Sequence, residues 1–238
     1  MKLKLVRNDE TLDDLQINGI CIIQKKNSFR FGVDAVLLAN FAKIKPKMNI
    51  IDLCSGTGIV PFIIAGKTKA EHIIGMEIQK DMVDMATRSV IFNLVDFEFL
   101  KKLPKADVVT VNPPYKLKNS GITNAQYENA ISRHEICCTL EDVIRAAKIL
   151  LKDNGKLYMI HRPDRLVDIM YTMRKYNIEP KLMTMVQPCV NKAPNMVLIE
   201  GQNNGKPFLK WEASICVHKL DGSYTDEIDI IYGRCLRR

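Results

Sequence analysis

Four consecutive residues near the middle of the chain, Asn112-Pro113-Pro114-Tyr115, follow the apolar run Asp107–Val111. Because proline donates no backbone hydrogen bond and stiffens the chain, the two prolines end this run as a strand. The Asn112 amide and the Pro113 carbonyl then form a pair of fixed hydrogen-bond acceptors, neither of them a strong base. Such a pair suits a flat –NH2 group conjugated with a ring or carbonyl, on which Tyr115 could stack. We therefore expect these four residues to be catalytic by positioning an amine, without a general base.

A second candidate site lies in the run IIDLCSGTGIVP, in which Asp52 ends a predicted strand and Gly56 and Gly58 form the turn into a helix. Glycine lets the backbone approach a ligand closely, and the free N–H groups of a helix start point toward it. Pro61 occupies the third-glycine position of the dinucleotide fingerprint, and the P-loop spacing is absent, so nicotinamide and triphosphate ligands are disfavoured. Nineteen residues after Gly58, Glu77 ends the next strand, where its carboxylate could accept both ribose hydroxyls. These residues predict a nucleotide-like cofactor.

Each of these signals also has a simpler structural interpretation. The prolines could form an ordinary turn after a buried strand, the glycines could serve any tight strand-to-helix turn, and Glu77 could be a charge at a helix N-terminus. The order in which the three signals follow one another along the chain favours a functional site over coincidence.

The elements that must position these residues alternate between short apolar runs and helical patterns. Strands that are apolar on both faces and separated by helices indicate a parallel sheet covered on both sides, so we predict a doubly wound α/β fold. After Pro180 the pattern changes, and we expect antiparallel strands there, the last two joined by a hairpin turn at Asp221-Gly222. Asn18-Gly19 predicts another turn, in a small N-terminal hairpin. The predicted strands are Asn49–Leu53, His72–Ile78, Phe97–Leu100, Asp107–Val111 and Lys156–His161, and the predicted helices lie near Ile59–Lys67, Lys80–Asn93, Leu140–Lys152 and Arg165–Tyr176.

The length and composition suit a single soluble domain. A chain of 238 residues is long enough to bury a large core, and we expect one domain over residues 1–238. Within it, residues 1–32 would be a hairpin extension, and residues 33–238 would be the catalytic core with the C-terminal antiparallel strands. The N-terminus lacks the apolar region of a secretory signal, and no apolar run approaches the ~18 residues of a membrane span. Seven cysteines without a C-x-x-C pair indicate reduced thiols, so we expect a cytoplasmic protein without a metal.

Charge is unevenly distributed along the chain. The formal net charge is +8, but residues 51–100 hold four Lys/Arg and seven Asp/Glu, a balance of −3, which leaves +11 for the rest. A basic exterior indicates a polyanionic partner, and the acidic segment could hold a cationic ligand. On charge alone, the solvated surface of a lysine-rich protein explains the pattern equally well.

The glycine turn and the strand-end acid resemble those of class I S-adenosylmethionine-dependent methyltransferases, whose turn reads acidic-x-G-x-G-x-G. Cys54 takes the place of the first glycine here, and we expect it to be tolerated if its φ is negative. The resemblance implies S-adenosylmethionine as the cofactor, and no Lys or Arg lies between Met48 and Phe62 to oppose its cationic groups. The acid that reads the cofactor's adenine near the end of the third strand in this family has no clear counterpart.

The motif Asn112-Pro113-Pro114-Tyr115 resembles that of amino methyltransferases acting on adenine N6, guanine N2 or protein glutamine. Longer stretches are similar to the bacterial tRNA1(Val) adenine-N6 methyltransferase family over nearly the whole chain, namely DDLQ, FRFGVDAVLLANFA, ISRHEICCTLEDVI, YMIHRPDRL, NMVLIEG and YTDEIDIIYG. This resemblance implies a class I fold with a mostly parallel, seven-stranded sheet. It also implies methylation of N6 of an adenosine next to the anticodon of a tRNA, in a valine tRNA, by direct attack of the amine in a monomeric enzyme.

The resemblance assigns further residues by position. It implies that the cofactor is bound by Phe31, Gly32, Asp34, Asp52, Cys54, Ser55, Gly56, Gly58, Glu77, Ile78 and Asn112. For the RNA, the candidates are Arg30, Lys116, Lys118, Arg133 and Arg162. His161, beside Arg162, could line the path of the RNA or be a satisfied residue at a strand end.

Three alternatives stay open at this stage. A protein glutamine N5-methyltransferase of the release-factor type shares the Asn-Pro-Pro-Tyr motif, but such enzymes carry a separate N-terminal helical domain, and this chain is basic. A non-catalytic RNA-binding protein on a decayed methyltransferase fold is suggested by Cys54 and the missing third-strand acid. A ribosomal-RNA guanine or adenine methyltransferase is the third.

Overall fold

The computed structural model describes residues 5–26, 31–93, 105–115 and 139–234. The strands are β1 (Glu10–Asp14), β2 (Cys21–Lys25), β3 (Asn49–Leu53), β4 (His72–Met76), β5 (Ala106–Val111), β6 (Leu151–His161), β7 (Ile178–Cys189), β8 (Met196–Asn203), β9 (Lys210–Trp211) and β10 (Ile215–His218). The helices are α1 (Val33–Phe41), α2 (Ile59–Lys67), α3 (Lys80–Asn93), α5 (Leu140–Leu150), the short 3₁₀ helix η2 (Pro163–Arg165), α6 (Leu166–Lys175) and α7 (Asp226–Ile231).

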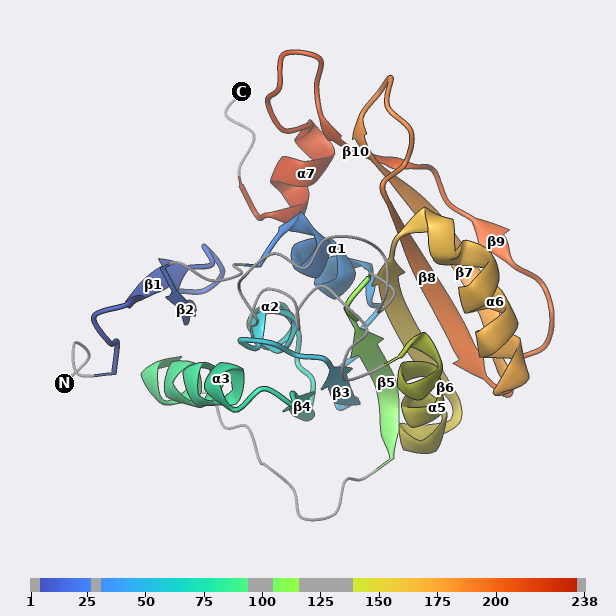
Figure 1. Ribbon diagram of the computed structural model, residues 1–238, viewed down its shortest axis with the longest axis horizontal. Helices are drawn as coiled ribbons and strands as arrows, with labels where there is room; N and C mark the ends of the chain where they lie inside the picture. The colour runs from blue at the N-terminus through green and yellow to red at the C-terminus, as the bar shows by residue number, and fades with distance from the viewer. Residues whose placement is uncertain (1–4, 27–30, 94–104, 116–138, 235–238) are drawn as a thin grey trace.

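The main sheet has the strand order β10-β7-β8-β6-β5-β3-β4, with the short strand β9 beside β7 (Figure 1). Strands β4, β3, β5 and β6 are parallel, whereas β8 runs antiparallel to both of its neighbours, β6 and β7. The predicted doubly wound, mostly parallel sheet is therefore confirmed. The predicted strand Phe97–Leu100 lies outside the described residues.

The two faces of the sheet carry separate layers of the hydrophobic core. Alternate residues of β6 divide between them, because successive side chains of a strand point to opposite faces. Tyr158 and Ile160 pack with residues of α1, α2 and α7, and Leu157 and Met159 pack with residues of α5 and α6. The same alternation along β5 turns Asn112, just after the strand, toward the α1 layer.

The N-terminal hairpin β1–β2 lies beside α3, at the edge of the molecule (Figure 1). In its turn Asn18 and Gly19 have φ values of 49° and 71°, and the Ile20 N–H donates to the Ile17 carbonyl at 2.9 Å. Positive φ at both central residues is what a type I′ hairpin turn requires, and Asn and Gly adopt it most readily. The predicted hairpin is confirmed.

Two ion pairs and a hydroxyl join this hairpin to α3. Glu10 and Arg88 form a bidentate pair at 2.6 and 2.7 Å, with side chains only 1% and 12% exposed. Lys25 and Asp81 form a second pair at 3.0 Å, in which the carboxylate is 69% exposed. The buried Ser89 hydroxyl accepts a hydrogen bond from the backbone N–H of β2.

The C-terminal segment differs from the prediction. A turn does occur at Asp221-Gly222, where the Lys219 N–H donates to the Ser223 carbonyl at 2.8 Å. The residues after it form α7 instead of the expected second strand of a hairpin. The Thr225 hydroxyl caps this helix by accepting the Ile228 N–H, and acidic residues occupy its first turn, where they favour a helix. The prediction of a strand here was wrong. None of the helices in the described ranges is long and apolar enough to span a bilayer.

Candidate active site

The carboxyl ends of β3, β4 and β5 lie side by side. Leu53, the last residue of β3, pairs with Met76 on one side and with Val111 on the other. The turn after β3, Glu77 after β4 and Asn112 after β5 therefore leave the sheet at neighbouring points. In open parallel sheets this edge is where ligands bind.

The turn between β3 and α2 is built on two glycines with positive φ, 57° at Gly56 and 86° at Gly58. The Gly58 N–H donates to the Ser55 carbonyl at 2.9 Å, and the Ser55 N–H donates to Met76 on β4 at 3.0 Å. A Cβ at Gly58 would lie 3.1 Å from the Phe62 ring, whereas one at Gly56 would meet no atom within 4 Å. The backbone at Gly56 thus faces open space, which suits the close approach of a ligand.

Cys54 departs from the expectation of a negative φ, because its φ is +57°. This left-handed conformation costs an L-residue with a Cβ roughly 1–2 kcal/mol relative to glycine. The position thus has a backbone conformation that favours glycine, although the residue is a cysteine. The condition set for its tolerance, a negative φ, is therefore not met, and the turn holds the cysteine at the expense of local strain.

Glu77 is tied directly to the glycine turn. Its Oε2 accepts the Gly56 N–H at 2.9 Å and its Oε1 accepts the Gln79 N–H at 2.9 Å. Each carboxylate oxygen can accept a second hydrogen bond, so the group is oriented and still available to hydroxyls of a ligand. Next to it, Ile78 exposes 70% of its surface, as an apolar platform would.

Asp52 lies within β3, below the turn, and is 1% exposed. It accepts a hydrogen bond at 2.6 Å from the hydroxyl of Thr110, its neighbour on β5. Burial raises the pKa of Asp52 to about 7, against the opposing effect of the Thr110 hydrogen bond. The carboxyl therefore changes its charge near neutral pH.

Asp34, in the first turn of α1, joins two of the candidate catalytic residues. Its Oδ2 accepts hydrogen bonds from Asn112 Nδ2 at 3.1 Å and from the Tyr115 hydroxyl at 3.0 Å. A carboxylate only accepts, so Asn112 turns its NH2 group toward Asp34 and presents Oδ1 elsewhere. The Tyr115 hydroxyl contacts this Oδ1 as well. Burial and the nearby Asp34 charge raise the pKa of Tyr115 well above its usual value, so the phenol keeps its proton.

The ring of Tyr115 packs against His161 at the end of β6. The ring centroids are 5.3 Å apart and the planes meet at 67°, an edge-on arrangement. His161 is fully buried, and burial lowers its pKa to about 4. Pro113 is buried, and Pro114 is partly exposed.

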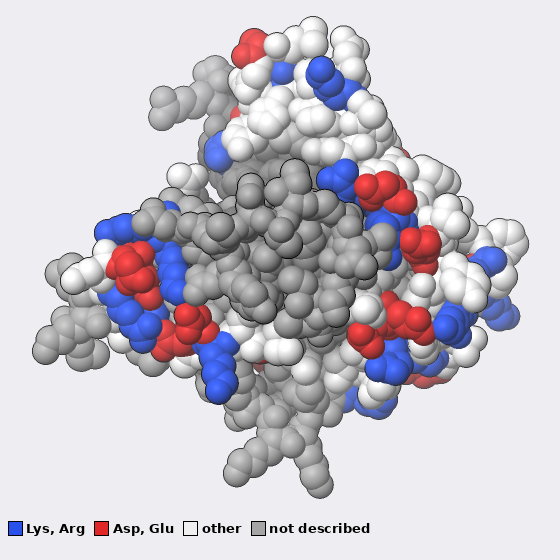
Figure 2. All heavy atoms as spheres, in the orientation of Figure 1, with Lys and Arg blue, Asp and Glu red and all other residues white. Residues whose placement is uncertain are grey.

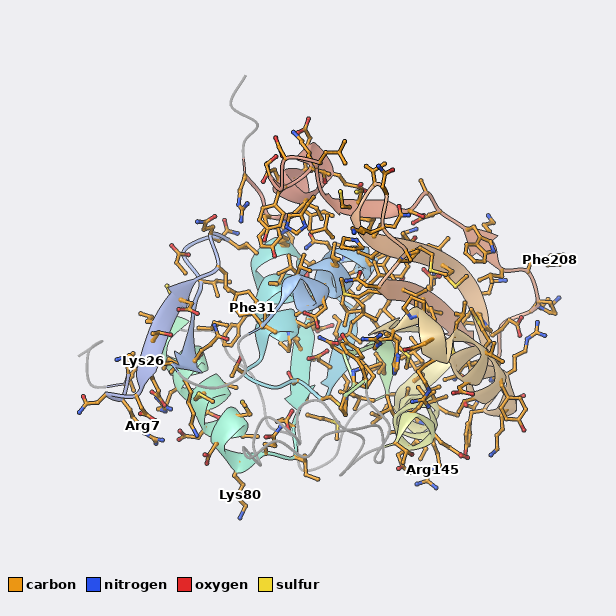
Figure 3. All side chains as sticks on the ribbon, turned by 45° about the horizontal axis from the view of Figure 1, so that its top comes forward. Arg7, Lys26, Phe31, Lys80, Arg145 and Phe208 are labelled. Carbon is orange, nitrogen blue, oxygen red and sulfur yellow. The ribbon has the colours of Figure 1, made fainter. Side chains whose placement is uncertain are left out.

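The segment before α1 is positioned by the hairpin. The Phe31 N–H donates to Oε1 of Gln24, a buried residue of β2, at 3.1 Å. In Figure 3, Phe31 lies between the hairpin and α1. Gly32 forms the N-cap of α1, and a Cβ there would lie 2.7 Å from Asp34 Oδ1. Gly32 therefore makes room for the carboxylate that orients Asn112.

The candidate RNA-binding residues are less well placed. Arg30, Lys116, Lys118 and Arg133 lie outside the described residues, and Arg162 is exposed and paired with Asp164 at 3.1 Å. On the face in Figure 2, Lys and Arg are interleaved with Asp and Glu on both flanks. In the described part of the chain, no three His, Cys, Asp or Glu side chains come together in a way that could hold a metal ion.

Two residues of the site were missed by the sequence analysis. Thr110 interrupts the apolar run VVTV, and a hydroxyl in a buried strand is a signal that could have identified it as a partner for a buried acid. Gln24 follows the apolar run CII and has no comparable local signal.

The site fits a ligand with a positive charge, a ribose and a flat base. Glu77 contacts the turn through the Gly56 N–H, Asp52 lies below it in β3, and no Lys or Arg lies between residues 48 and 62. The open space at Gly56, the oriented carboxylate of Glu77 and the exposed Ile78 lie together at one end of it. S-Adenosylmethionine has all three properties.

The chain belongs to the methyltransferase small domain family, whose model matches residues 31–170. It therefore has the class I fold, and S-adenosylmethionine is its cofactor, as the glycine turn and the strand-end acid predicted.

Several similar proteins carry a more specific name. The tRNA1(Val) (adenine(37)-N6)-methyltransferase of Aliivibrio salmonicida (strain LFI1238) is 23% identical over 209 residues, which cover 83% of this chain and 86% of that protein. The protein of the same name from Bacteroides thetaiotaomicron is 23% identical over 223 residues, covering 89% and 93%. The solved structure of a predicted O-methyltransferase from Agrobacterium tumefaciens superposes with a TM-score of 0.66 at 21% identity, covering 84% and 95%. The predicted resemblance to the tRNA1(Val) family is confirmed at this low identity, and the solved structure confirms the fold alone.

Proposed function

We propose that this protein transfers a methyl group from S-adenosylmethionine to N6 of an adenosine beside the anticodon of a tRNA, namely a valine tRNA. The observation that carries the proposal is the contact of Asp34 with Asn112, which presents an amide oxygen at the sheet edge next to the glycine turn. The two curated relatives act, by their names, on adenine 37 of tRNA1(Val). In this proposal residues 1–238 form one catalytic domain, a cytoplasmic monomer whose partner is the anticodon loop.

In this proposal the side chains bind and orient the cofactor and the target base. Glu77 would accept the ribose hydroxyls of the cofactor on its two oriented oxygens, and Ile78 would cover the face of its adenine. The bound S-adenosylmethionine supplies an electrophilic methyl group. Because the turn at Gly56 adjoins the start of the Asn112 loop, an amine held at that loop lies next to the cofactor site.

Asn112 and Pro113 would hold the amine of the target base. Asn112 Oδ1 and the Pro113 carbonyl would each accept one N–H, which favours a pyramidal nitrogen with its lone pair available for attack. The nitrogen forms a bond to the methyl carbon as the carbon–sulfur bond breaks, and the surplus proton of the amine is released to solvent. We expect such preorganisation to lower the activation barrier by several kcal/mol without a general base. This is the order of magnitude found for positioned hydrogen-bond donors in other enzymes.

Tyr115 must move during this process. Its hydroxyl contacts Asn112 Oδ1, the atom that would accept from the target amine. The amine therefore replaces the hydroxyl, and the released ring becomes available to stack on the base. The unstacked bases of an anticodon loop make this exchange less costly than extraction from a duplex.

The proposal is tested by incubating the protein with labelled S-adenosylmethionine and unmodified bulk tRNA, followed by digestion and identification of nucleosides. Label in N6-methyladenosine of a valine tRNA is the expected result. Label only in protein would support a glutamine methyltransferase, and label only in guanosine or only in added ribosomal RNA would support the corresponding enzymes. Each of these results would reject the proposal. Calorimetric titration with S-adenosylmethionine addresses the decayed, non-catalytic alternative, since absence of binding at millimolar ligand would favour it.

The role of the amide is tested with Asn112→Ala. This variant should lose methyl transfer while its affinity for S-adenosylmethionine, measured by calorimetry, stays within a few-fold of the wild type. A variant that keeps most of its turnover would show that Asn112 does not hold the amine.

A further inference from the structure

His161 ends β6 beside the catalytic motif. Strands β5 and β6 are parallel, with Val111 paired to Met159, and Pro113 and His161 each follow two residues further along. The His161 ring packs edge-on against Tyr115, 5.3 Å between centroids, and the residue is 0% exposed. An imidazole is thus enclosed next to the side chain that covers Asn112 Oδ1.

Only one of its two ring nitrogens has a hydrogen-bond partner among the described residues. Nδ1 accepts the Arg162 N–H at 2.8 Å. A ring nitrogen that accepts carries no proton, so the neutral imidazole is the Nε2–H tautomer. Burial lowers the pKa of His161 to about 4, so this neutral form persists at physiological pH. The Nε2 atom is buried and, in the described part of the chain, unpartnered.

A buried donor without an acceptor is costly. It destabilises the folded state by about 1–3 kcal/mol, and such groups are rare in native proteins. The nearby carboxylates are engaged elsewhere, Asp164 with Arg162 at 3.1 Å and Asp168 with Arg165 at 2.8 Å. An acceptor brought by a ligand would remove this cost, and the catalytic motif next to the ring is where the ligand binds.

We propose that His161 reads the target base by donating a hydrogen bond from Nε2–H to the ring nitrogen beside the amine that Asn112 holds. The inference rests on the proposed function and deepens it. In adenine, both ring nitrogens next to the amine, N1 and N7, carry a lone pair. When the base displaces the Tyr115 hydroxyl from Asn112, the ring that packs on His161 moves as well and exposes the donor. The bond orients the base without accelerating the transfer, so its loss raises KM more than it lowers kcat.

The test uses the wild-type protein and full-length valine tRNA assembled by ligation, with adenosine, 1-deazaadenosine or 7-deazaadenosine at the target position. Each analogue keeps the amine and replaces one ring nitrogen by C–H. We expect one of the two analogues to lose about tenfold in kcat/KM, which corresponds to ~1.4 kcal/mol, mainly through KM. Equal methylation of all three RNAs, within twofold, would overturn the inference and leave the proposed function intact. Failure to methylate even the adenosine RNA would reject the proposed function itself.

Two variants separate recognition from a structural role. His161→Phe keeps an aromatic ring against Tyr115 and removes the donor, so it should methylate adenosine RNA about tenfold less efficiently and no longer distinguish the sensitive analogue. His161→Gln keeps an N–H of similar reach and should restore part of the discrimination. Unchanged discrimination in His161→Phe would overturn the inference. The analogue series on the wild type decides the question if the variants fail to fold, which thermal unfolding and cofactor affinity would reveal.

Discussion

The direction of a single amide decides whether the edge of this sheet can hold an amine. Either end of the Asn112 side chain could face the site, but only the oxygen accepts an N–H. Because the NH2 group of Asn112 donates its hydrogen bond to Asp34, the oxygen is the end that faces the site. Gly32 in turn leaves the space that the Asp34 carboxylate occupies. The orientation of Asn112 therefore depends on two residues of a distant segment, Gly32 and Asp34.

Gly32→Ala tests this dependence. The φ of Gly32, −103°, is open to alanine, so the backbone is not strained, but the new Cβ would lie 2.7 Å from Asp34 Oδ1 and displace it. We expect kcat/KM to fall by about tenfold, roughly the loss of one charge-assisted hydrogen bond, with a melting temperature close to that of the wild type. In an Asp34→Ala background the same change should have no further effect on steady-state kinetics. Additive losses in the double variant would show that Gly32 acts by another route.

Cys54→Gly should stabilise the protein. The φ of +57° strains a cysteine and suits glycine, although the glycine makes the unfolded chain more flexible and offsets part of the gain. The expected net increase in the free energy of unfolding is about 0.5–1 kcal/mol, measured by chemical denaturation. Cys216→Gly, in strand β10 with an ordinary φ, serves as the control and should destabilise by a similar amount. A destabilised Cys54→Gly would mean that the thiol contributes more than the strain costs.

Asp52→Asn should change how stability depends on pH. The folded-state pKa of about 7 exceeds the ordinary value of 3.8, so between these values the folded protein binds more protons than the unfolded chain. Its stability therefore falls as pH rises from about 4 to 7, and the asparagine variant is free of this loss. The variant should gain roughly 2–4 kcal/mol relative to the wild type between pH 4 and pH 8 in denaturation without cofactor. A constant difference over this range would contradict the assigned titration.

Among the elements of the fold, the N-terminal hairpin is linked to the candidate site by a hydrogen bond from outside the main sheet. Gln24 on β2 fixes the backbone at Phe31, just before the helix that carries Asp34. The hairpin itself is held on α3 by the buried Glu10–Arg88 pair and the exposed Lys25–Asp81 pair. The hairpin therefore helps to position the segment that begins α1, on one side of the candidate active site.

The two ion pairs allow a matched comparison. Glu10→Gln removes the buried carboxylate from Arg88, which keeps only its half-exposed partner Asp84 at 2.8 Å, and should cost about 1–3 kcal/mol of unfolding free energy. Lys25→Ala should cost less than about 0.5 kcal/mol. The pKa of Glu10 is lowered chiefly by its hydrogen bonds with Arg88, so the contribution of this pair is present above pH 4.5 and lost as the pH falls through the lowered pKa. Equal costs for the two variants at pH 7 would show that burial does not distinguish the pairs.

Local signals account for the elements that were predicted well. The elements β3, α2 and α3 have the predicted bounds. Apolar runs, the glycine turn and the spacing of helical positions mark these bounds in the sequence. Helix α7 was mistaken for a strand because EIDII alternates polar and apolar residues, while the cap at Thr225 decides for a helix. The contact of Asp34 with Asn112 joins residues 78 positions apart, which no local pattern indicates. The site residues could be nominated from the sequence, but not the hydrogen bonds that orient them.

At the scale of the whole molecule, Figure 2 shows how charge is distributed over the described residues of one face. There the described cations are interleaved with acids. Exposed ion pairs of the described residues include Arg145 with Asp142 and Lys175 with Glu141. Such exposed pairs contribute little to stability. The net charge of +8 still attracts a polyanion from a distance, whatever the local pairing.

Binding of tRNA should therefore weaken steeply with salt. We expect the Kd for unmodified valine tRNA to rise by roughly tenfold or more between about 50 and 200 mM salt, because each neutralised phosphate releases counterions. Filter binding or fluorescence anisotropy measures this slope. The affinity for S-adenosylmethionine, measured over the same range, is the control and should change little. An RNA affinity that does not respond to salt would argue against a polyanionic substrate.

The contact of the Tyr115 hydroxyl with Asn112 has one more consequence. While the hydroxyl contacts Asn112 Oδ1, it takes the place that water or a small amine would otherwise occupy on this oxygen. Hydrolysis of the methyl donor, or its transfer to small amines, should therefore be slow in the absence of RNA. Only a base that displaces the Tyr115 hydroxyl would reach the Asn112 oxygen.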